Sequence, residues 1–219
     1  MKVAVVSANI GGIDEPQAHV EQSMRCHIYY VTEHNMPFPM PDFSDRLKSK
    51  YIKIQMHRFL PGFDYYIWMD GRIRMANADM VKEIIGLLKT SDFVFTAHPD
   101  RQTLAEEFDL LISCLEKNDP YIIERYAHSA FHKERAHYEK YIGSCGAMQL
   151  FASGFFAFAA TPGNFRFMDE WWEMVIRFGV FDQSQLAAMV YKVNPQKTTI
   201  PLYNNGLFEI GKHKPRPTE

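Results

Sequence analysis

The sequence predicts a single α/β domain with a mainly parallel central sheet flanked by helices. Two observations support this fold class. Short apolar segments rich in β-branched and aromatic residues alternate with amphipathic segments of helical length. No linker, internal repeat or low-complexity segment interrupts this alternation over 219 residues, a length typical of one large domain. We therefore expect one α/β domain over residues 1–219.

The first half of the chain predicts four strands and two helices. The strands are expected at residues 3–8, 26–32, 63–69 and 93–97. Ser44 or Asp45 can cap a first helix that runs to about Phe59, where Pro61-Gly62 would end it. A second helix is expected from Asn77 or Asp79 to Leu88.

The second half of the chain predicts mainly helices. Thr103 and Glu106 have the spacing of a capping box for a helix through Leu115. One long helix or a pair of helices is expected over 119–141, followed by a buried strand at 153–161. The remaining predicted elements are helices at 164–177 and 182–191, the latter capped by Asp182, a short strand near 198–202, and a tail from about 206.

Composition and charge exclude several classes of protein. Hydrophobic residues make up 47% of the chain, which is a globular composition. The formal net charge of −2 provides no global basic field, so no nucleic-acid partner is expected. Three widely spaced cysteines indicate reduced thiols and hence a cytoplasmic location. No segment approaches the ~20 apolar residues of a transmembrane helix.

The segment Phe63–Met75 contains the most informative candidate site. The seven residues Phe63–Met69, all apolar or aromatic except Asp64, lead directly into Asp70 and Gly71, with Arg72 two residues after the aspartate. Open α/β sheets present polar groups to ligands at the carboxyl ends of their strands. Asp70 could bind a ribose hydroxyl or a metal ion, Gly71 would let the backbone approach a ligand, and Arg72 could bind a phosphate. The alternative interpretation is an ordinary Asp-Gly turn.

Further candidates follow the strand at 93–97, whose end should lie beside Asp70 because parallel strands point the same way. Arg101 could contact a phosphate and Glu107 an acceptor hydroxyl, with His98 in support. Glu106 is better explained as part of the capping box. His57 precedes the Asp70 strand and could equally be an acceptor-side residue or a surface charge.

Several ordered segments resemble a family of glycosyltransferase-like proteins. They include VVSANIGGIDEP, CHIYYVTEHN, HPDRQTLAEEFD, SGFFAFAAT and FDQSQLAAMVYK, and the densest match is HRFLPGFDYYIWMDG. The family includes plant Golgi proteins linked to mucilage polysaccharide (TOD/MUCI type) and many bacterial and viral members. The resemblance covers roughly residues 3–192. More distantly, the sequence pattern is similar to that of retaining GT-A glycosyltransferases, which implies a single GT-A-like (Rossmann-like) domain.

The resemblance implies roles for the candidate residues. Asp182 and Gln183 match an Asp-Gln pair beside the reacting carbon of the sugar, which makes them the expected catalytic residues. A carboxylate there suits the cationic transition state of glycosyl transfer. The alternative for Asp182 is a simple helix cap. The donor-binding residues implied are Ala8, Asn9, Asp70, Gly71, Arg72, Arg101 and Lys214.

The metal motif of the GT-A enzymes is incomplete here. Their strand ends in D-x-D, but if Asp70 is the first residue the second is Arg72, and if Asp70 is the second the first is Trp68. Residues 211–215 resemble G-x-x-K-P, in which Lys214 would touch the diphosphate, yet Phe208 stands where the metal-binding histidine is expected. Asp70 is thus a questionable ligand for Mn²⁺ or Mg²⁺. We hypothesise that Arg72 and Lys214 supply fixed cations instead. The alternative for the tail is a disordered basic end.

Two functions are therefore carried forward from the sequence. The first is a glycosyltransferase that moves a sugar from a nucleotide-sugar donor to a glycan or other hydroxyl acceptor. The second is a catalytically silent GT-A-like module that binds nucleotide or glycan. A hydrolase is disfavoured because no Ser-His-Asp arrangement or zinc-ligand cluster stands out.

Overall fold

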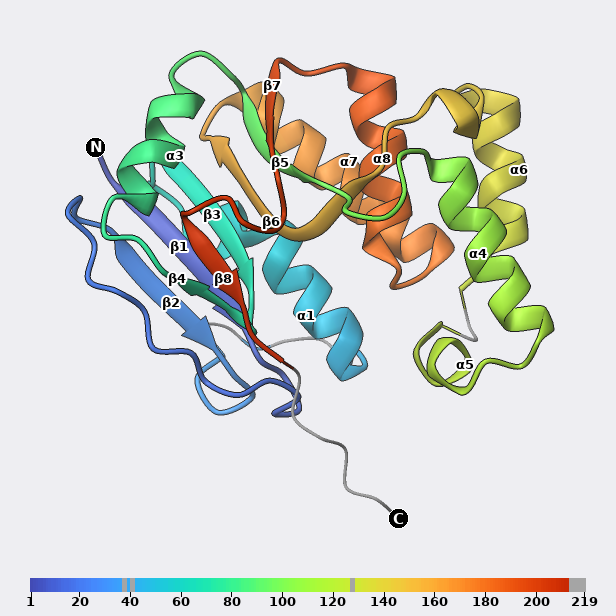
Figure 1. The fold of residues 1–219 in the computed structure, drawn as a ribbon, viewed down its shortest axis with the longest axis horizontal. Helices are drawn as coiled ribbons and strands as arrows, with labels where there is room; N and C mark the ends of the chain where they lie inside the picture. The colour runs from blue at the N-terminus through green and yellow to red at the C-terminus, as the bar shows by residue number, and fades with distance from the viewer. Residues whose placement is uncertain (37–38, 40–41, 127–128, 213–219) are drawn as a thin grey trace.

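A computed structural model describes residues 1–36, 39, 42–126 and 129–212 of the chain. Six strands form a central sheet in the order β2-β1-β3-β6-β5-β7 (Figure 1). Their bounds are β1 Val3–Ala8, β2 His27–Val31, β3 Tyr65–Asp70, β5 Phe93–Ala97, β6 Phe151–Ala159 and β7 Lys197–Ile200. Two short strands, β4 Ile73–Met75 and β8 Phe208–Ile210, form a separate antiparallel pair.

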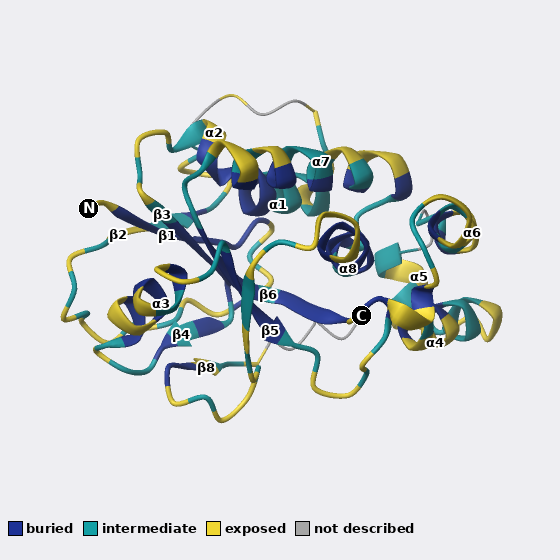
Figure 2. Cartoon of the chain, turned by 90° about the horizontal axis from the view of Figure 1, so that it is seen from above, coloured by how far each residue is buried: buried dark blue, intermediate teal, exposed yellow. Residues whose placement is uncertain are grey.

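Helices cover both faces of the sheet, as Figure 2 shows. Their bounds are α1 Asp45–Ile54, α2 Met56–Phe59, α3 Met80–Leu88, α4 Leu104–Glu116, α5 Pro120–Tyr126, α6 Phe131–Tyr141, α7 Pro162–Phe178 and α8 Asp182–Val193, with a 3-10 turn at Cys145–Ala147. Helices α1, α7 and α8 bury apolar residues against one face, and α3 with the β4-β8 pair packs on the other. Helices α4 and α6 form a third apolar cluster with α8 beyond the edge of the sheet.

The predicted α/β fold class is confirmed, but the sheet is not purely parallel. Strands β2, β1 and β3 pair in parallel, as do β5 and β7, whereas β6 runs antiparallel to both β3 and β5. The physical reason lies in the connection from β5 to β6. Ala97 at the end of β5 pairs with Phe151 at the start of β6. The chain therefore leaves the sheet and, after forming α4–α6, re-enters it at the same end of the strands.

Most predicted elements form for the expected local reasons. The Thr103 side chain accepts a hydrogen bond from the Glu106 amide, and the Glu106 carboxylate accepts one from the Thr103 amide, so the capping box is present. Ser44 caps α1 by accepting from the amide of Leu47. Of the two alternatives for 119–141, a pair of helices is the one that forms.

Three details differ from the sequence predictions. The helix expected from Asp45 to Phe59 is divided at Gln55, which leaves helical geometry at φ −102° and ψ 21°. Asp182 does not cap α8, because Phe181 holds that position and the Asp182 carboxylate binds lysines instead. The β4-β8 pair was not predicted, since each three-residue strand is too short to show alternation.

As far as it is described, the C-terminal segment returns to the face of the central sheet that α3 covers. Ile73–Met75 pairs with Phe208–Ile210, and the amide of Gly211 donates to the carbonyl of Arg72 at 2.7 Å. In the parts of the chain that the structure describes, no helix is long and apolar enough to cross a membrane.

Candidate functional site

Two adjoining cavities open where the carboxyl ends of β1, β3 and β5 meet the start of β6. The first has a volume of about 150 Å³ and is lined by Ala8 and Asn9 at the end of β1. The second, of about 360 Å³, is lined by His98 and Gln183. They share four residues, namely Arg46, Lys50, Asp70 and Arg125. The cavities therefore form one divided site, with charged residues at the junction.

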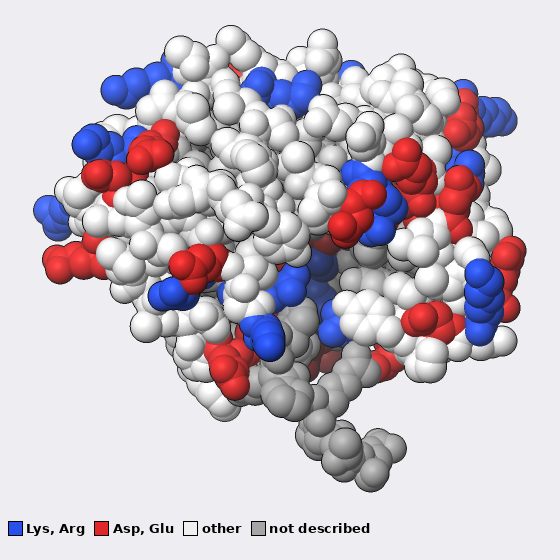
Figure 3. Space-filling view, viewed as in Figure 1, with Lys and Arg blue, Asp and Glu red and all other residues white. Residues whose placement is uncertain are grey.

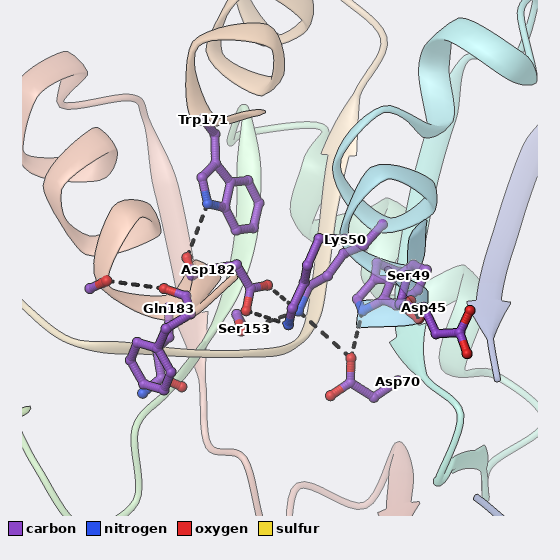
Figure 4. A network of polar contacts seen from close by, with 12 residues as sticks. Asp45, Ser49, Lys50, Asp70, Ser153, Trp171, Asp182 and Gln183 are labelled. Carbon is purple, nitrogen blue, oxygen red and sulfur yellow. Dashed lines mark hydrogen bonds and ion pairs between the residues drawn. The ribbon is translucent and has the colours of Figure 1, made fainter. Parts of the chain in front are cut away.

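Asp182 is the most tightly held carboxylate at this junction (Figure 4). It lies at the start of α8, with only 5% of its side chain exposed. Its Oδ1 is 2.5 Å from Lys50 Nζ and its Oδ2 is 2.7 Å from Lys53 Nζ. Burial by itself would raise the pKa of Asp182, but the two ammonium groups outweigh burial and lower the pKa to about 2. Asp182 is consequently an ionised carboxylate at neutral pH.

Lys53 connects Asp182 to Asp70. Its ammonium, on a side chain that is 2% exposed, lies 3.7 Å from Asp70 Oδ1 and 3.1 Å from Ser153 Oγ. Asp70 Oδ1 also accepts a hydrogen bond from Trp68 Nε1 at 2.9 Å. A buried lysine without carboxylate partners would be costly, so the burial of Lys53 depends on these contacts. The two carboxylates predicted from different parts of the sequence thus meet at one ammonium.

Three arginines around the junction have no carboxylate partner among the described residues. Arg46 and Arg125 line both cavities, and Arg72 lines the second. The Arg46 guanidinium lies over the ring of Tyr126, 5.9 Å from its centroid. Arg125 Nε is buried and has no hydrogen-bond partner within the part of the chain that the structure describes. Blue side chains are visible inside a hollow below the middle of the molecule in Figure 3. The junction therefore offers cationic groups to an anionic ligand.

The residues at Asp70 do not fit a divalent cation. Within the described ranges, no group of three or more His, Cys, Asp or Glu side chains could hold a metal ion. Lys53 occupies the space between the two carboxylates, and Phe208 is buried against Phe155 with its ring centroid 4.4 Å away. The Lys53 ammonium pairs with both Asp70 and Asp182, and Lys50 provides a second ammonium to Asp182.

The β1 end of the first cavity is organised by contacts within the protein. The Asn9 side chain donates to the Asp14 carbonyl at 2.8 Å and to Tyr30 Oη at 2.9 Å, and its Oδ1 accepts from the Asp14 amide. A Cβ on Gly71 would lie 2.7 Å from Asp14 Oδ2 and 3.0 Å from the Ala8 carbonyl. Gly71 is therefore required by the close approach of Asp14, and Asn9 holds the loop that carries Asp14.

Gln183 belongs to a series of polar side-chain contacts that extends away from the junction. Its Nε2 donates to Glu107 Oε1 at 3.1 Å, and Glu107 also binds the guanidinium of Arg101. Burial raises the pKa of Glu107, while Arg101 opposes that shift. Burial, followed by Arg101, lowers the pKa of His98 to about 4, so His98 is a neutral hydrogen-bond acceptor that lines the second cavity.

The remaining predicted site residues are not brought to the junction. Arg101 pairs with Glu107 and lines a different, outer cavity near Gln102. His57 contacts Asp169 at 3.2 Å and stacks on Phe165 within the helical layer, away from both cavities. Lys214 lies outside the described residues, so its predicted contact with the donor stays a prediction.

Sequence reasoning missed Arg46, Lys50, Lys53 and Arg125. The first three are spaced by four and three residues, which places them on one face of α1. That spacing was available from the sequence, but a basic helical stripe usually faces solvent. The burial of Lys53 among apolar neighbours could not be inferred without Asp182, which is 129 residues away.

The fold and the site define an α/β domain with a charged cleft at the carboxyl ends of its strands, the usual ligand position in open sheets. The comparison with known families agrees with this class. The chain belongs to the TOD1/MUCI70, glycosyltransferase-like domain family, whose model matches residues 13–209. This confirms the resemblance noted in the sequence. No curated protein matches the chain.

Proposed function

We propose that the protein is a GT-A-like glycosyltransferase that moves a sugar from a nucleotide-sugar donor to a glycan or other hydroxyl acceptor. The family assignment points to glycosyl transfer. The observation that carries the finer proposal is the junction itself. Asp70 and Asp182 meet at Lys53, and they are surrounded by three arginines that have no carboxylate partner among the described residues. A ligand with an anionic centre and a hydroxyl-rich end matches this arrangement.

The two cavities suggest how the donor would lie. The diphosphate would occupy the junction beside Arg46 and Arg125, where planar guanidinium groups can bind phosphate oxygens with two hydrogen bonds. The nucleoside would lie in the first cavity, near Asp14, which can accept hydrogen bonds from hydroxyl or amine groups. The sugar and the acceptor would share the second, larger cavity with Gln183 and His98.

The proposed chemistry uses charges that the protein already holds. Transfer develops positive charge on the sugar and negative charge on the departing diphosphate. Asp182 would orient the sugar and stabilise the positive charge because its low pKa keeps it ionised. Arg46, Arg72 and Arg125 would stabilise the departing diphosphate as fixed cations. Because the residues at Asp70 do not fit a divalent ion, no step of this proposal requires one.

A panel of nucleotides and nucleotide sugars tests the proposal by thermal shift, followed by donor hydrolysis and transfer assays on each hit. A transferase should bind one class of donor and turn it over in chelator-treated samples. Asp182→Asn should lose turnover while keeping the fold. Strict dependence on Mn²⁺ would contradict the fixed-cation scheme. Binding without turnover across a broad acceptor screen would favour the alternative, a catalytically silent module that binds nucleotide or glycan.

A further inference from the structure

Lys50 and Lys53 bind the same carboxylate but differ in their surroundings. The Lys53 side chain is 2% exposed and also contacts Asp70 and Ser153. The Lys50 side chain is 23% exposed and has Asp182 as its one ion-pair partner in the described part of the chain. Lys50 lines both cavities together with Arg46 and Arg125. Lys53 lines the first cavity only and is almost fully buried, whereas Lys50 is more exposed and borders both cavities, so Lys50 is the better placed of the two lysines to meet a ligand at the junction.

We propose that Lys50 exchanges partners when a diphosphate enters the junction. In the free protein its ammonium pairs with Asp182 Oδ1, and in the complex it moves to a phosphate oxygen. The movement leaves Asp182 Oδ1 available to accept a hydrogen bond from a hydroxyl of the donor sugar. Lys50 is thus a positioning residue that makes Asp182 ready only when the anionic part of the donor is bound. This inference rests on the function proposed above.

Asp182 can release Lys50 because it does not depend on Lys50 alone. Removing the last partner of a buried charge is strongly unfavourable. Lys53 remains 2.7 Å from Asp182 Oδ2 after the exchange, so the buried carboxylate keeps one cation. The Trp171 indole also donates to the Asp182 carbonyl at 3.0 Å, which anchors the start of α8 independently of Lys50. The exchange therefore replaces one charge-assisted contact with another of the same kind.

The lysine is also able to make the movement. Its long side chain has several rotatable bonds and three donors that need no fixed plane, unlike the guanidinium of arginine. Arg46 precedes it by one helical turn, and both side chains face the junction from α1. A phosphate held by Arg46 and Arg125 would therefore lie within the region that Lys50 already borders.

A double-mutant cycle with inorganic pyrophosphate tests the exchange by isothermal titration calorimetry of the full chain. Lys50→Met should weaken pyrophosphate binding roughly tenfold, because one charge-assisted contact is lost. Asp182→Asn should strengthen it several-fold, because Lys50 no longer has a competing partner. In the Lys50→Met background, Asp182→Asn should have little effect. Such non-additivity is the signature of two coupled residues.

Two controls separate the exchange from general electrostatics. Asp100→Asn removes another carboxylate that lines the second cavity, and its small effect should be the same with or without Lys50. Lys48→Met removes a lysine of α1 that pairs with Asp45 and borders neither cavity, and it should leave the affinity unchanged. If Asp182→Asn does not fold, the Lys50→Met variant tests the exchange by itself, because an unchanged affinity for pyrophosphate would overturn the exchange.

The outcomes also distinguish this inference from the proposed function. Pyrophosphate binding with an equal Asp182→Asn effect in both backgrounds would overturn the exchange and leave the transferase proposal standing. An absence of pyrophosphate binding in the unmodified protein would overturn the diphosphate site, and with it both proposals. Turnover of a nucleotide sugar together with additive binding effects would retain the enzyme and reject the role of Lys50.

Discussion

The Lys53 ammonium lies 2.7 Å from Asp182 Oδ2 and 3.7 Å from Asp70 Oδ1, and so joins two carboxylates that are 112 residues apart in the sequence. One comes from the end of a strand and the other from the start of a helix. Because the lysine is almost fully buried, this contact affects both the stability of the fold and the charge of the site.

Replacing Lys53 with methionine should destabilise the protein by about 1.5–3 kcal/mol, the range for losing a contact to a charged group, because Lys50 still pairs with Asp182 and Asp70 is partly exposed. The methionine fills a similar volume but leaves Asp70 without its cation. Urea unfolding at pH 7 measures the change. Lys48→Met is the matched control, since its pair with Asp45 is on the surface, and it should cost less than about 1 kcal/mol. Equal costs for the two variants would show that the Lys53 contacts contribute little.

Asp182 should make the stability depend on pH under acidic conditions. Its pKa is about 2 in the folded protein and 3.8 as an ordinary carboxyl, so the unfolded state binds the proton more tightly. The resulting stabilisation, about 2 kcal/mol, is present above pH 4 and is lost as the pH falls toward 2. As the pH is lowered from 6 to 2, the free energy of unfolding should decrease more steeply for the unmodified protein than for Asp182→Asn. Parallel curves would contradict the prediction.

Glu134 should produce the opposite dependence near neutral pH. It is fully buried under α8, and burial raises its pKa to about 7 although Tyr138, Ser184 and Gln185 donate to its Oε1. Because the folded protein holds this proton more tightly than the unfolded chain, stability falls as the pH rises from about 4.5 to above 7, by on the order of 3 kcal/mol.

Glu134→Gln tests this dependence, because Glu134 Oε2 accepts no hydrogen bond from any described residue and an amide nitrogen can take its place. The variant should gain stability relative to the unmodified protein as the pH rises from 4.5 to 8. Thermal unfolding across this range measures the difference. A constant difference at every pH would show that Glu134 keeps an ordinary pKa in the folded protein.

Gly71→Ala should cost about 1–3 kcal/mol, because its new methyl group would meet Asp14 Oδ2 at 2.7 Å and the Ala8 carbonyl at 3.0 Å. Gly86→Ala is the matched control. Gly86 lies inside α3 with open space around its position, so alanine there should stabilise the helix by up to about 1 kcal/mol. Chemical denaturation of both variants measures the contrast, and a neutral Gly71→Ala would mean that the Asp14 loop moves away easily.

Local sequence patterns predicted the elements well where the physical cause is local. The strand Phe93–Ala97 has the predicted bounds, and the capping box at Thr103 forms because its partners are three residues apart. The direction of Phe151–Ala159 was not predictable in this way. Both directions bury the same apolar residues, and the choice depends on where the α4–α6 segment returns the chain to the sheet.

By itself, the sequence determined the α/β class, the family, and the two carboxylates Asp70 and Asp182, because strand ends, helix starts and motif order are properties of nearby residues. Only the tertiary structure decided how these charges are neutralised. Lys50 and Lys53 reach Asp182 from more than 120 residues away, and their burial is favourable only after α1, β3 and α8 have packed together. Ion pairs of this kind depend on distances in space, which no local pattern encodes.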